Sequence, residues 1–204
     1  MRVERWVPAA AWWLPALLLG LAGAAHAQSQ KPAPRATLAE RIASCTACHG
    51  PGGNATIATF PSLAGQPKIF IENQLVLIRE GLRDVPAMKD VMAGMQDDEI
   101  VALAKHFAAQ PVAPRSAPQQ AESVRRGGQL SRSLLCGTCH LPGYTGQNQV
   151  PRLAGQNQEY LLTSMKEFRD HPGPGRDTIM AATLRGLSDT DLADLAHYLA
   201  GFKP

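Results

Sequence analysis

The sequence predicts an all-helical fold built from two copies of one small module. Three observations support this prediction. Blocks of sequence recur in the same order, the segments around them carry apolar residues at helical spacing, and no stretch sustains the alternation of apolar and polar residues typical of a strand. A chain of 204 residues is long enough for one or two domains. We therefore expect two tandem helical domains and no sheet.

Three blocks define the repeat. The motif CTACH at 45–49 recurs 91 residues later as CGTCH. The segment PSLAGQ at 61–66 recurs 90 residues later as PRLAGQ, and the segment 88–100 has its counterpart 92 residues later. The constant order and the nearly constant offset indicate two copies of one module.

Two further segments set the boundaries of the copies. Residues 110–119 contain three prolines and no apolar periodicity, which is typical of a semi-extended linker. Residues 1–27 are typical of a secretion signal, because a basic start is followed by an apolar run and an Ala-His-Ala cleavage site. We expect a signal peptide at 1–27, an N-terminal domain at 28–113 and a C-terminal domain at 114–204.

Removal of the signal leaves 177 residues with a formal charge of +2 and no tryptophan. No later segment has the length and apolarity of a membrane span, so the sequence predicts a soluble protein of the periplasm. An uncleaved membrane anchor is the alternative, and Pro8 and Pro15 disfavour it because they interrupt the apolar run. The chain lacks a basic stripe with interleaved aromatic residues, so no nucleic-acid partner is expected.

Each copy is predicted to contain three main helices. The expected ranges are 37–48, 68–80 and 97–109 in the first copy and 121–139, 157–169 and 189–200 in the second. Ser188 followed by Asp191 is typical of a capping box at the start of the last helix. A module of about 85 residues buries little surface by itself, so we expect a bound group to complete each core.

The Cys-x-x-Cys-His motif predicts that this group is a covalently attached c-type haem. At the end of a helix, positions i, i+3 and i+4 lie on one face, so both thiols and the imidazole reach the same side of a bound group. The motif residues are Cys45, Cys48, His49, Cys136, Cys139 and His140. The sequence therefore predicts two covalently bound haem c groups with iron, one in each module.

Three other sites could use the same cysteines. A thioredoxin-like site needs a βαβ context, which the sequence lacks. A four-cysteine zinc site needs the two pairs to converge, although each pair belongs to its own repeat. Disulfides across single helical turns would leave the histidines that follow unexplained. Haem attachment uses all four cysteines and both histidines.

The sixth iron ligand is predicted from the repeat. Methionine, histidine and an open position are all known at this place. Only Met88 and Met180 are methionines in equivalent positions, and they follow the motif histidine by 39 and 40 residues. The remaining candidates are interpreted as core or surface residues: Met92, Met95, Met165, His106, His171 and His197.

Pro61 and Pro151 begin the second repeated block, and their role has two interpretations. A ligating histidine usually donates its second ring N–H to a fixed acceptor, which a carbonyl of each Pro-x-Leu segment could provide. Each segment could equally be a stiff turn before a helix. The residues alone do not decide between the two.

Taken together, the duplicated haem motif, the duplicated Pro-x-Leu-Ala-Gly-Gln segment and the duplicated methionine segment resemble cytochrome c4 over essentially the whole mature chain. The resemblance implies two tandem class I cytochrome c domains with His/Met ligation of both irons. The implied ligands are His49 with Met88 and His140 with Met180, and the implied imidazole acceptors are the carbonyls of Pro61 and Pro151. Two departures are His106, where an aromatic residue is expected, and the insert at 171–175.

The expected activity is outer-sphere electron transfer without substrate chemistry, so the chain is not expected to be an enzyme. The resemblance implies transfer from a quinol-oxidising cytochrome complex to a terminal oxidase, and it leaves loose membrane association open. One alternative is an electron-transfer subunit of a dehydrogenase complex such as flavocytochrome sulfide dehydrogenase. A di-haem peroxidase is disfavoured, because it needs an open or displaceable ligand position and both modules retain a methionine candidate.

Overall fold

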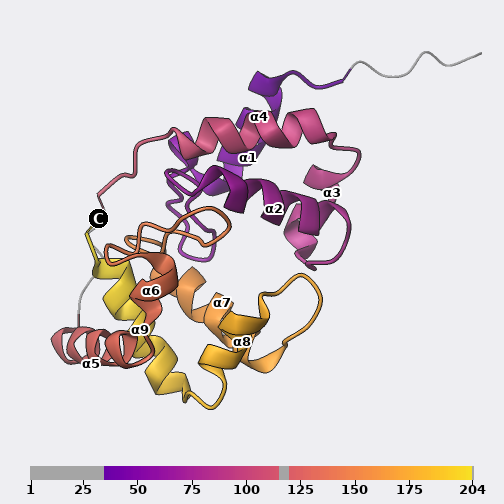
Figure 1. Cartoon of the computed structure of the whole chain (residues 1–204). Helices are drawn as coiled ribbons and strands as arrows, with labels where there is room; N and C mark the ends of the chain where they lie inside the picture. Colours follow the sequence, from indigo (N-terminus) through magenta and orange to yellow (C-terminus); the bar gives the residue numbers. More distant parts are fainter. Residues whose placement is uncertain (1–34, 115–119, 204) are drawn as a thin grey trace, which may run out of the picture. The chain divides into compact units, whose positions relative to one another are not determined.

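Helices make up the regular structure of the chain in the computed structural model, which describes residues 35–114 and 120–203 (Figure 1). Within these ranges there is no strand, only an isolated bridge between Gln147 and Val150. The residues from Ala36 onward fall into one compact unit. The predicted signal peptide at 1–27 lies outside the described residues. The expectation of an all-helical fold is confirmed.

The main helices occur in the same order in both copies, with α5 and α6 together in place of α1. The first module contains α1 (Leu38–His49), the short 3-10 helix η1 (Pro51–Gly53), α2 (Lys68–Arg79), α3 (Pro86–Met92) and α4 (Asp97–Ala108). The second module contains α5 (Ala121–Ser133), α6 (Cys136–His140), α7 (Gln158–Asp170), α8 (Thr178–Leu184) and α9 (Asp189–Gly201). None of these helices, in the ranges that the structure covers, is long and apolar enough to cross a membrane.

Side chains cap the starts of α1 and α9. The predicted capping box of Ser188 and Asp191 is present at the start of α9. Thr37 and Glu40 form the same arrangement at the start of α1. These caps satisfy N–H groups that the first helical turn leaves without an intrahelical partner. They also fix where the helices begin, and hence where the haem motif at the end of α1 lies.

The predicted helix 121–139 is wrong in one respect, because the structure divides it into α5 and α6. Leu135 adopts a left-handed backbone conformation with φ 55° and ψ 33°. Its N–H closes the last turn of α5 on the carbonyl of Arg132 at 3.1 Å, and its own carbonyl accepts from Thr138 at 2.9 Å. A single left-handed residue ends one helix and redirects the chain into the next. Helical periodicity does not reveal such a break.

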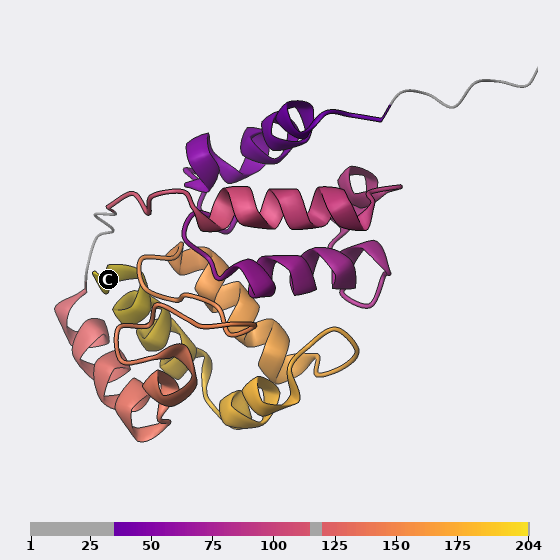
Figure 2. The ribbon, with the colours of Figure 1, turned by 45° about the horizontal axis from the view of Figure 1, so that its top comes forward.

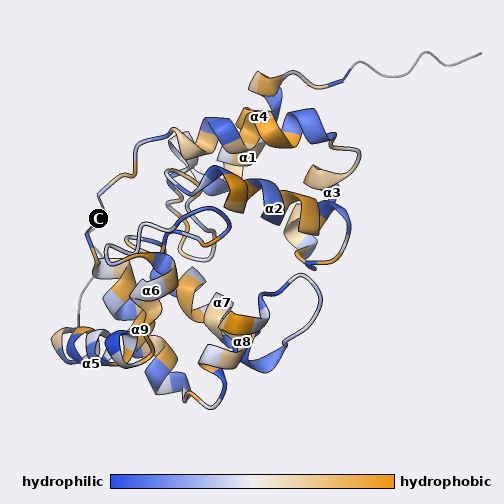
Figure 3. Cartoon of the chain, in the orientation of Figure 1, coloured by the Kyte–Doolittle hydropathy of each residue, from blue (hydrophilic) through white to orange (hydrophobic). Residues whose placement is uncertain are grey.

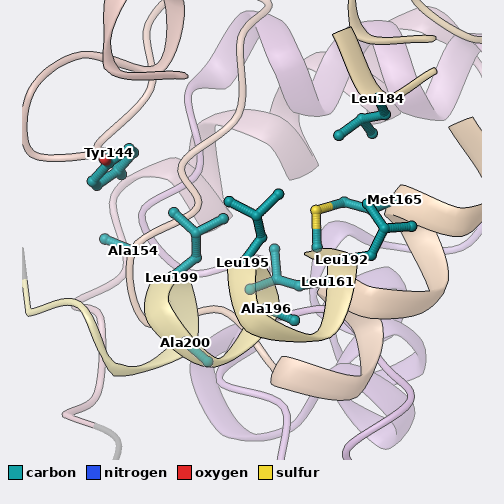
Figure 4. Close-up of a cluster of buried hydrophobic side chains, with 10 residues drawn as sticks. All are labelled: Tyr144, Ala154, Leu161, Met165, Leu184, Leu192, Leu195, Ala196, Leu199 and Ala200. Atoms are coloured by element: carbon teal, nitrogen blue, oxygen red, sulfur yellow. The ribbon is translucent and has the colours of Figure 1, made fainter. Parts of the chain in front are cut away.

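Each module has its own hydrophobic core. The first is formed by Ile71, Met92, Met95, Ile100, Leu103, Ala104 and Phe107. The second is formed by Tyr144, Ala154, Leu161, Met165, Leu184, Leu192, Leu195, Ala196, Leu199 and Ala200, with Leu195 projecting from α9 between Leu199 and Met165 (Figure 4). The interpretation of Met92, Met95 and Met165 as core residues is therefore confirmed.

The C-terminal helix of each module packs against a neighbour. In both views α2 lies beside α4, and α5 lies beside α9 (Figures 1 and 2). Hydrophilic residues dominate α5 (Figure 3), so the burial of apolar side chains is not all that keeps α5 packed against α9. Gly127 brings its backbone against α9, where an added Cβ would lie 2.0 Å from the carbonyl oxygen of Asp194. Arg126 in turn forms an ion pair with Asp194.

The first residues of the predicted linker 110–119 are fastened to the first module. The Asn54 side chain donates to the carbonyl of Pro111 at 3.0 Å and accepts from the N–H of Ala113 at 2.9 Å. Of the rest of this segment, residues 115–119 lie outside the described ranges. The described part of the linker therefore begins as an ordered extension of the first module.

Candidate functional site

The two cysteine motifs end two helices. In the first module the motif forms the last turn of α1, and in the second it forms α6. The four cysteines are free, so the disulfide alternative finds no support. In each motif the first thiol, Cys45 or Cys136, is half-buried, whereas the second, Cys48 or Cys139, is exposed. Burial raises the pKa of Cys45 and of Cys136, so both are protonated at neutral pH.

Both motif histidines are buried and oriented by a backbone carbonyl. His49 is 6% exposed, and its Nδ1 lies 2.8 Å from the carbonyl oxygen of Pro61. His140 is 3% exposed, and its Nδ1 lies 2.8 Å from the carbonyl oxygen of Pro151. A carbonyl can only accept, so Nδ1 carries the proton and Nε2 is left as the nitrogen for a metal. Burial lowers the pKa of both imidazoles, which favours this neutral form.

The loop that carries each accepting carbonyl is itself anchored. In the first module the N–H groups of Leu63 and Ala64 donate to the carbonyl of Gly53, and Gly65 donates to that of Phe107. The second module has the same bonds at equivalent positions, from Leu153, Ala154 and Gly155 to Tyr144 and Leu199. Both loops therefore hold the proline carbonyl rigidly toward the imidazole, which fixes the orientation of the ring.

Met88 and Met180 occupy equivalent places in the two modules. Each is the third residue of a seven-residue helix, α3 or α8, and each is half-buried. Met88 packs against the first core and Met180 against the second. The N–H of Met180 donates to the N-capping Asp177 at 2.9 Å. The equivalent places of Met88 and Met180 support the prediction that their thioethers ligate iron. Ligation by these two residues stays a prediction.

The three other histidines lie in unrelated settings. His106 packs edge-on against Phe107 with 5.0 Å between ring centroids, and it stands where Tyr198 stands in the second module. His197 lies 3.1 Å from the side-chain nitrogen of Gln158. His171 is exposed in the inserted loop. None of the three has an equivalent in the other module, which fits their interpretation as packing or surface residues.

The rival metal site finds no support in the structure. Across residues 35–114 and 120–203, no group of three or more His, Cys, Asp or Glu side chains is arranged to hold a metal ion. The described helices also provide no βαβ unit for a thioredoxin-like site. The residues that are present fit haem: two free thiols one helical turn apart, followed by a buried imidazole with Nε2 available.

Two glutamines that the sequence did not single out join the two modules. Gln66 donates from Nε2 to the carbonyl of residue 152 at 3.0 Å and accepts at Oε1 from the N–H of the same residue at 2.9 Å. Gln156 does the same with residue 62, at 2.9 Å and 2.7 Å. Gln66 and Gln156 are equivalent in the repeat, as are Ser62 and Arg152. The available signal was a polar residue retained in both copies of PxLAGQ.

Further contacts surround this reciprocal pairing. Arg152 is 3% exposed, and its guanidinium donates to the carbonyl of Ala64 at 2.9 Å. The Asn157 side chain donates to the carbonyl of Ile57 at 3.1 Å. In the inserted loop, a Cβ on Gly175 would lie 2.3 Å from the carbonyl oxygen of Leu82. The two modules are therefore joined largely through backbone groups.

Comparisons with known proteins agree with this geometry. Residues 124–203 match the family model of cytochrome c, and residues 32–106 match that of the cbb3-type cytochrome c oxidase subunit III. Cytochrome c4 of Pseudomonas aeruginosa is 32% identical over 194 residues, covering 91% of this chain and 94% of the relative. A protein of Thiomonas intermedia named thiosulfate dehydrogenase electron acceptor is 36% identical over 180 residues, covering 83% of each chain.

A solved structure is similar as well. The crystal structure of reduced recombinant cytochrome c4 from Pseudomonas stutzeri superposes with a TM-score of 0.74 and 27% sequence identity. The likeness covers 80% of this chain and 95% of that one. It therefore extends over both modules rather than over one of them.

Proposed function

This chain belongs to the cytochrome c4 family, and we propose that it carries electrons in the periplasm from a quinol-oxidising complex to a terminal oxidase. It is a di-haem electron carrier with two covalently bound haem c groups. The observation that carries the proposal is the duplicated site itself. Each module presents a buried imidazole fixed by a proline carbonyl at the end of a free Cys-x-x-Cys pair.

The residues of each module have distinct tasks in this proposal. The two cysteines attach the haem covalently, and His49 with Met88, or His140 with Met180, ligate its iron. When bound, the haem supplies one-electron exchange at the iron. The protein holds each imidazole in a fixed place, because the ring is buried and the proline carbonyl prevents its rotation. The domains are proposed at 28–113 and 114–204, after a signal peptide at 1–27.

No substrate chemistry is proposed. An enzyme such as a di-haem peroxidase needs an open or displaceable position at one iron, whereas each module offers a half-buried methionine at the equivalent place. A haem with both axial positions filled exchanges electrons without a bound substrate.

Spectroscopy of ligand variants tests the proposal. The full chain is produced with a haem-maturation system and compared with Met88→Ala and Met180→Ala, with Met92→Leu as the buried control. We expect two low-spin haems with the red methionine–iron charge-transfer band in the wild type and in Met92→Leu, and one high-spin haem in each alanine variant. A high-spin or carbon-monoxide-binding haem in the wild type would contradict the carrier proposal.

A second candidate function is electron acceptance from one dedicated dehydrogenase. The named thiosulfate dehydrogenase electron acceptor, at 36% identity, favours this candidate over a flavocytochrome subunit. Purification of the untagged protein from its own periplasm separates the two functions. A stable complex with a dehydrogenase that reduces both haems would favour the second. A free protein reduced by the quinol-oxidising complex would favour the first.

A further inference from the structure

One peptide group connects the two modules at the imidazole of the second. The carbonyl of Pro151 accepts from Nδ1 of His140 at 2.8 Å. The N–H of the same peptide group, which belongs to Arg152, donates to Oε1 of Gln66 at 2.9 Å. The second module's histidine is therefore joined to a side chain of the first module through a single peptide unit.

The same chain of bonds runs in the opposite direction. The carbonyl of Pro61 accepts from Nδ1 of His49 at 2.8 Å, and the N–H of Ser62 donates to Oε1 of Gln156 at 2.7 Å. Each glutamine also donates to the carbonyl of the residue it clamps. This second bond fixes the amide orientation, because Oε1 must face the N–H and Nε2 the carbonyl.

Burial makes these bonds effective. Gln66 is 4% exposed and Gln156 is 2% exposed, so water has little access to either amide. In such a setting, hydrogen bonds in a chain polarise one another. An acceptor on the N–H side of a peptide group increases the negative charge on its carbonyl oxygen. The carbonyl then accepts more strongly from Nδ1–H, which increases the electron density of the imidazole.

We propose that Gln66 and Gln156 are positioning residues that tune the haem of the opposite module through these crossed peptide relays. The proposal rests on the proposed ligation of iron by His49 and His140. A more electron-rich imidazole favours oxidised iron, so each intact relay lowers the reduction potential of the haem that it reaches. Gln66 acts on the second module's haem, and Gln156 acts on the first module's haem.

Near-isosteric variants of the full holoprotein test the relays. Gln66→Met removes the acceptor of the Arg152 N–H, so the potential of the second haem rises while that of the first stays unchanged. Gln156→Met gives the reverse. Gln66→Glu retains an acceptor oxygen and therefore does not raise the second potential. The matched control is Tyr160→Phe, which removes the 3.4 Å contact of Arg83 across the same junction without touching a relay.

Three readouts follow the relays separately. Redox titration followed by nuclear magnetic resonance gives the potential of each haem, assigned through its methionine methyl signal. Hydrogen exchange of the Arg152 N–H should become about fivefold faster in Gln66→Met, which corresponds to the loss of one hydrogen bond. The Nδ1–H signal of His140 should shift in the reduced form of the same variant. In Tyr160→Phe all three readouts should match the wild type.

The outcomes distinguish this inference from the proposed function. Intact low-spin spectra with a shift only in the opposite module support the crossed relays. Intact spectra with no shift, with equal shifts of both haems, or with a shift in the glutamine's own module overturn them. A shift in Tyr160→Phe as large as in Gln66→Met also overturns them, because it would reflect a loosened junction. Loss of the methionine band in the wild type would contradict the ligation instead.

Discussion

At two equivalent positions after the motif histidine, the two modules share a positive φ but use different residues. The first module has Gly50 at φ 76° and Gly53 at φ 78°. The equivalent residues of the second module are Leu141 at φ 67° and Tyr144 at φ 52°. Positive φ strains an L-residue with a side chain, and glycine avoids that strain. A positive φ at these two positions therefore does not require glycine in both modules.

The surroundings explain why Tyr144 is tolerated where the first module needs Gly53. A Cβ on Gly53 would lie 2.8 Å from the Phe107 ring. In the second module Leu199 replaces that phenylalanine, and Tyr144 fills the space. Its hydroxyl lies 2.8 Å from that of Ser131. The large side chain is Phe107 on α4 in the first module and Tyr144 on the loop in the second. The two cores therefore reach similar packing by reciprocal substitution.

The N-terminal helices differ more. In the second module α5 approaches α9 so closely that Gly127 has no room for a side chain. The position equivalent to Gly127 in the first module is Ala36, which precedes α1. There, the ion pair of Arg41 with Glu99 at 2.9 Å links α1 to α4. Backbone contact therefore dominates one helix crossing, and side-chain contact dominates the other.

The largest expected effects come from one glycine in each module. Gly127→Ala should destabilise the second module by more than about 3 kcal/mol, because the added Cβ meets the backbone of α9. Gly50→Ala should do the same in the first module, because its Cβ would lie 2.1 Å from the Asn54 carbonyl oxygen at a positive φ. Hydrogen exchange with mass spectrometry resolves the two modules.

The control for both variants is Gly173→Ala, where an added Cβ meets nothing within 4 Å. It should leave the unfolding free energy of both modules unchanged. If Gly127→Ala destabilised the two modules equally, unfolding would be one cooperative event. The different contacts at the two helix crossings would then not translate into different stabilities of the two modules.

A smaller effect is expected at the ion pair of Arg126 with Asp194, where α5 crosses α9. Hydrogen bonding from Arg126 lowers the pKa of Asp194, whose side chain is 6% exposed. Asp194→Asn should lower the unfolding free energy of the second module by about 2 kcal/mol at pH 7. A carboxyl with a lowered pKa stabilises the fold above the unfolded pKa of about 4 and loses this contribution as the pH falls. The difference between variant and wild type should therefore shrink below pH 4.

Denaturant unfolding between pH 7 and pH 3 measures this difference. Glu122→Gln is the matched control on the same helix, because its ion pair with Arg125 is exposed on both sides. It should leave the unfolding free energy almost unchanged, because solvent screens an exposed ion pair. A constant difference between Asp194→Asn and wild type across this pH range would show that the carboxylate charge is not what stabilises the crossing.

The smallest effect is expected in the loop that follows the motif histidine of the second module. Leu141→Gly should raise the unfolding free energy of the second module by about 1 kcal/mol, because φ 67° and ψ 159° is a conformation that glycine adopts without strain. Thermal unfolding followed by hydrogen exchange of α6 measures the change. A decrease in stability would mean that packing of the Leu141 side chain outweighs the strain of its backbone.

Much of the helical framework could be predicted from the sequence. The repeat identifies equivalent segments, and apolar spacing places the main helices within a few residues of their observed ends. The break at Leu135 was not predictable, because left-handed leucine is rare and nothing in the local composition indicates it. The short helix η1 was missed as well, because it follows from the turn after His49 rather than from periodicity.

The candidate site could also be predicted only in part from the sequence. The motif residues are identified by spacing alone, because the covalent chemistry requires that spacing. The sequence left two interpretations of Pro61 open, and in the structure its carbonyl faces Nδ1 of His49. The partner of Gln66 could not be inferred, because it lies 86 residues away and is a backbone group. A contact made through a main-chain group does not restrict which residue type provides that group.

The reciprocal glutamine pairing has the symmetry of a contact between identical subunits. The same patch contributes from both sides, which is how two identical subunits meet about a twofold axis. Here both sides belong to one polypeptide, so the two halves need not be identical. Positions 62 and 152 contribute only backbone groups to the pairing, so they could diverge to serine and arginine while both glutamines stayed.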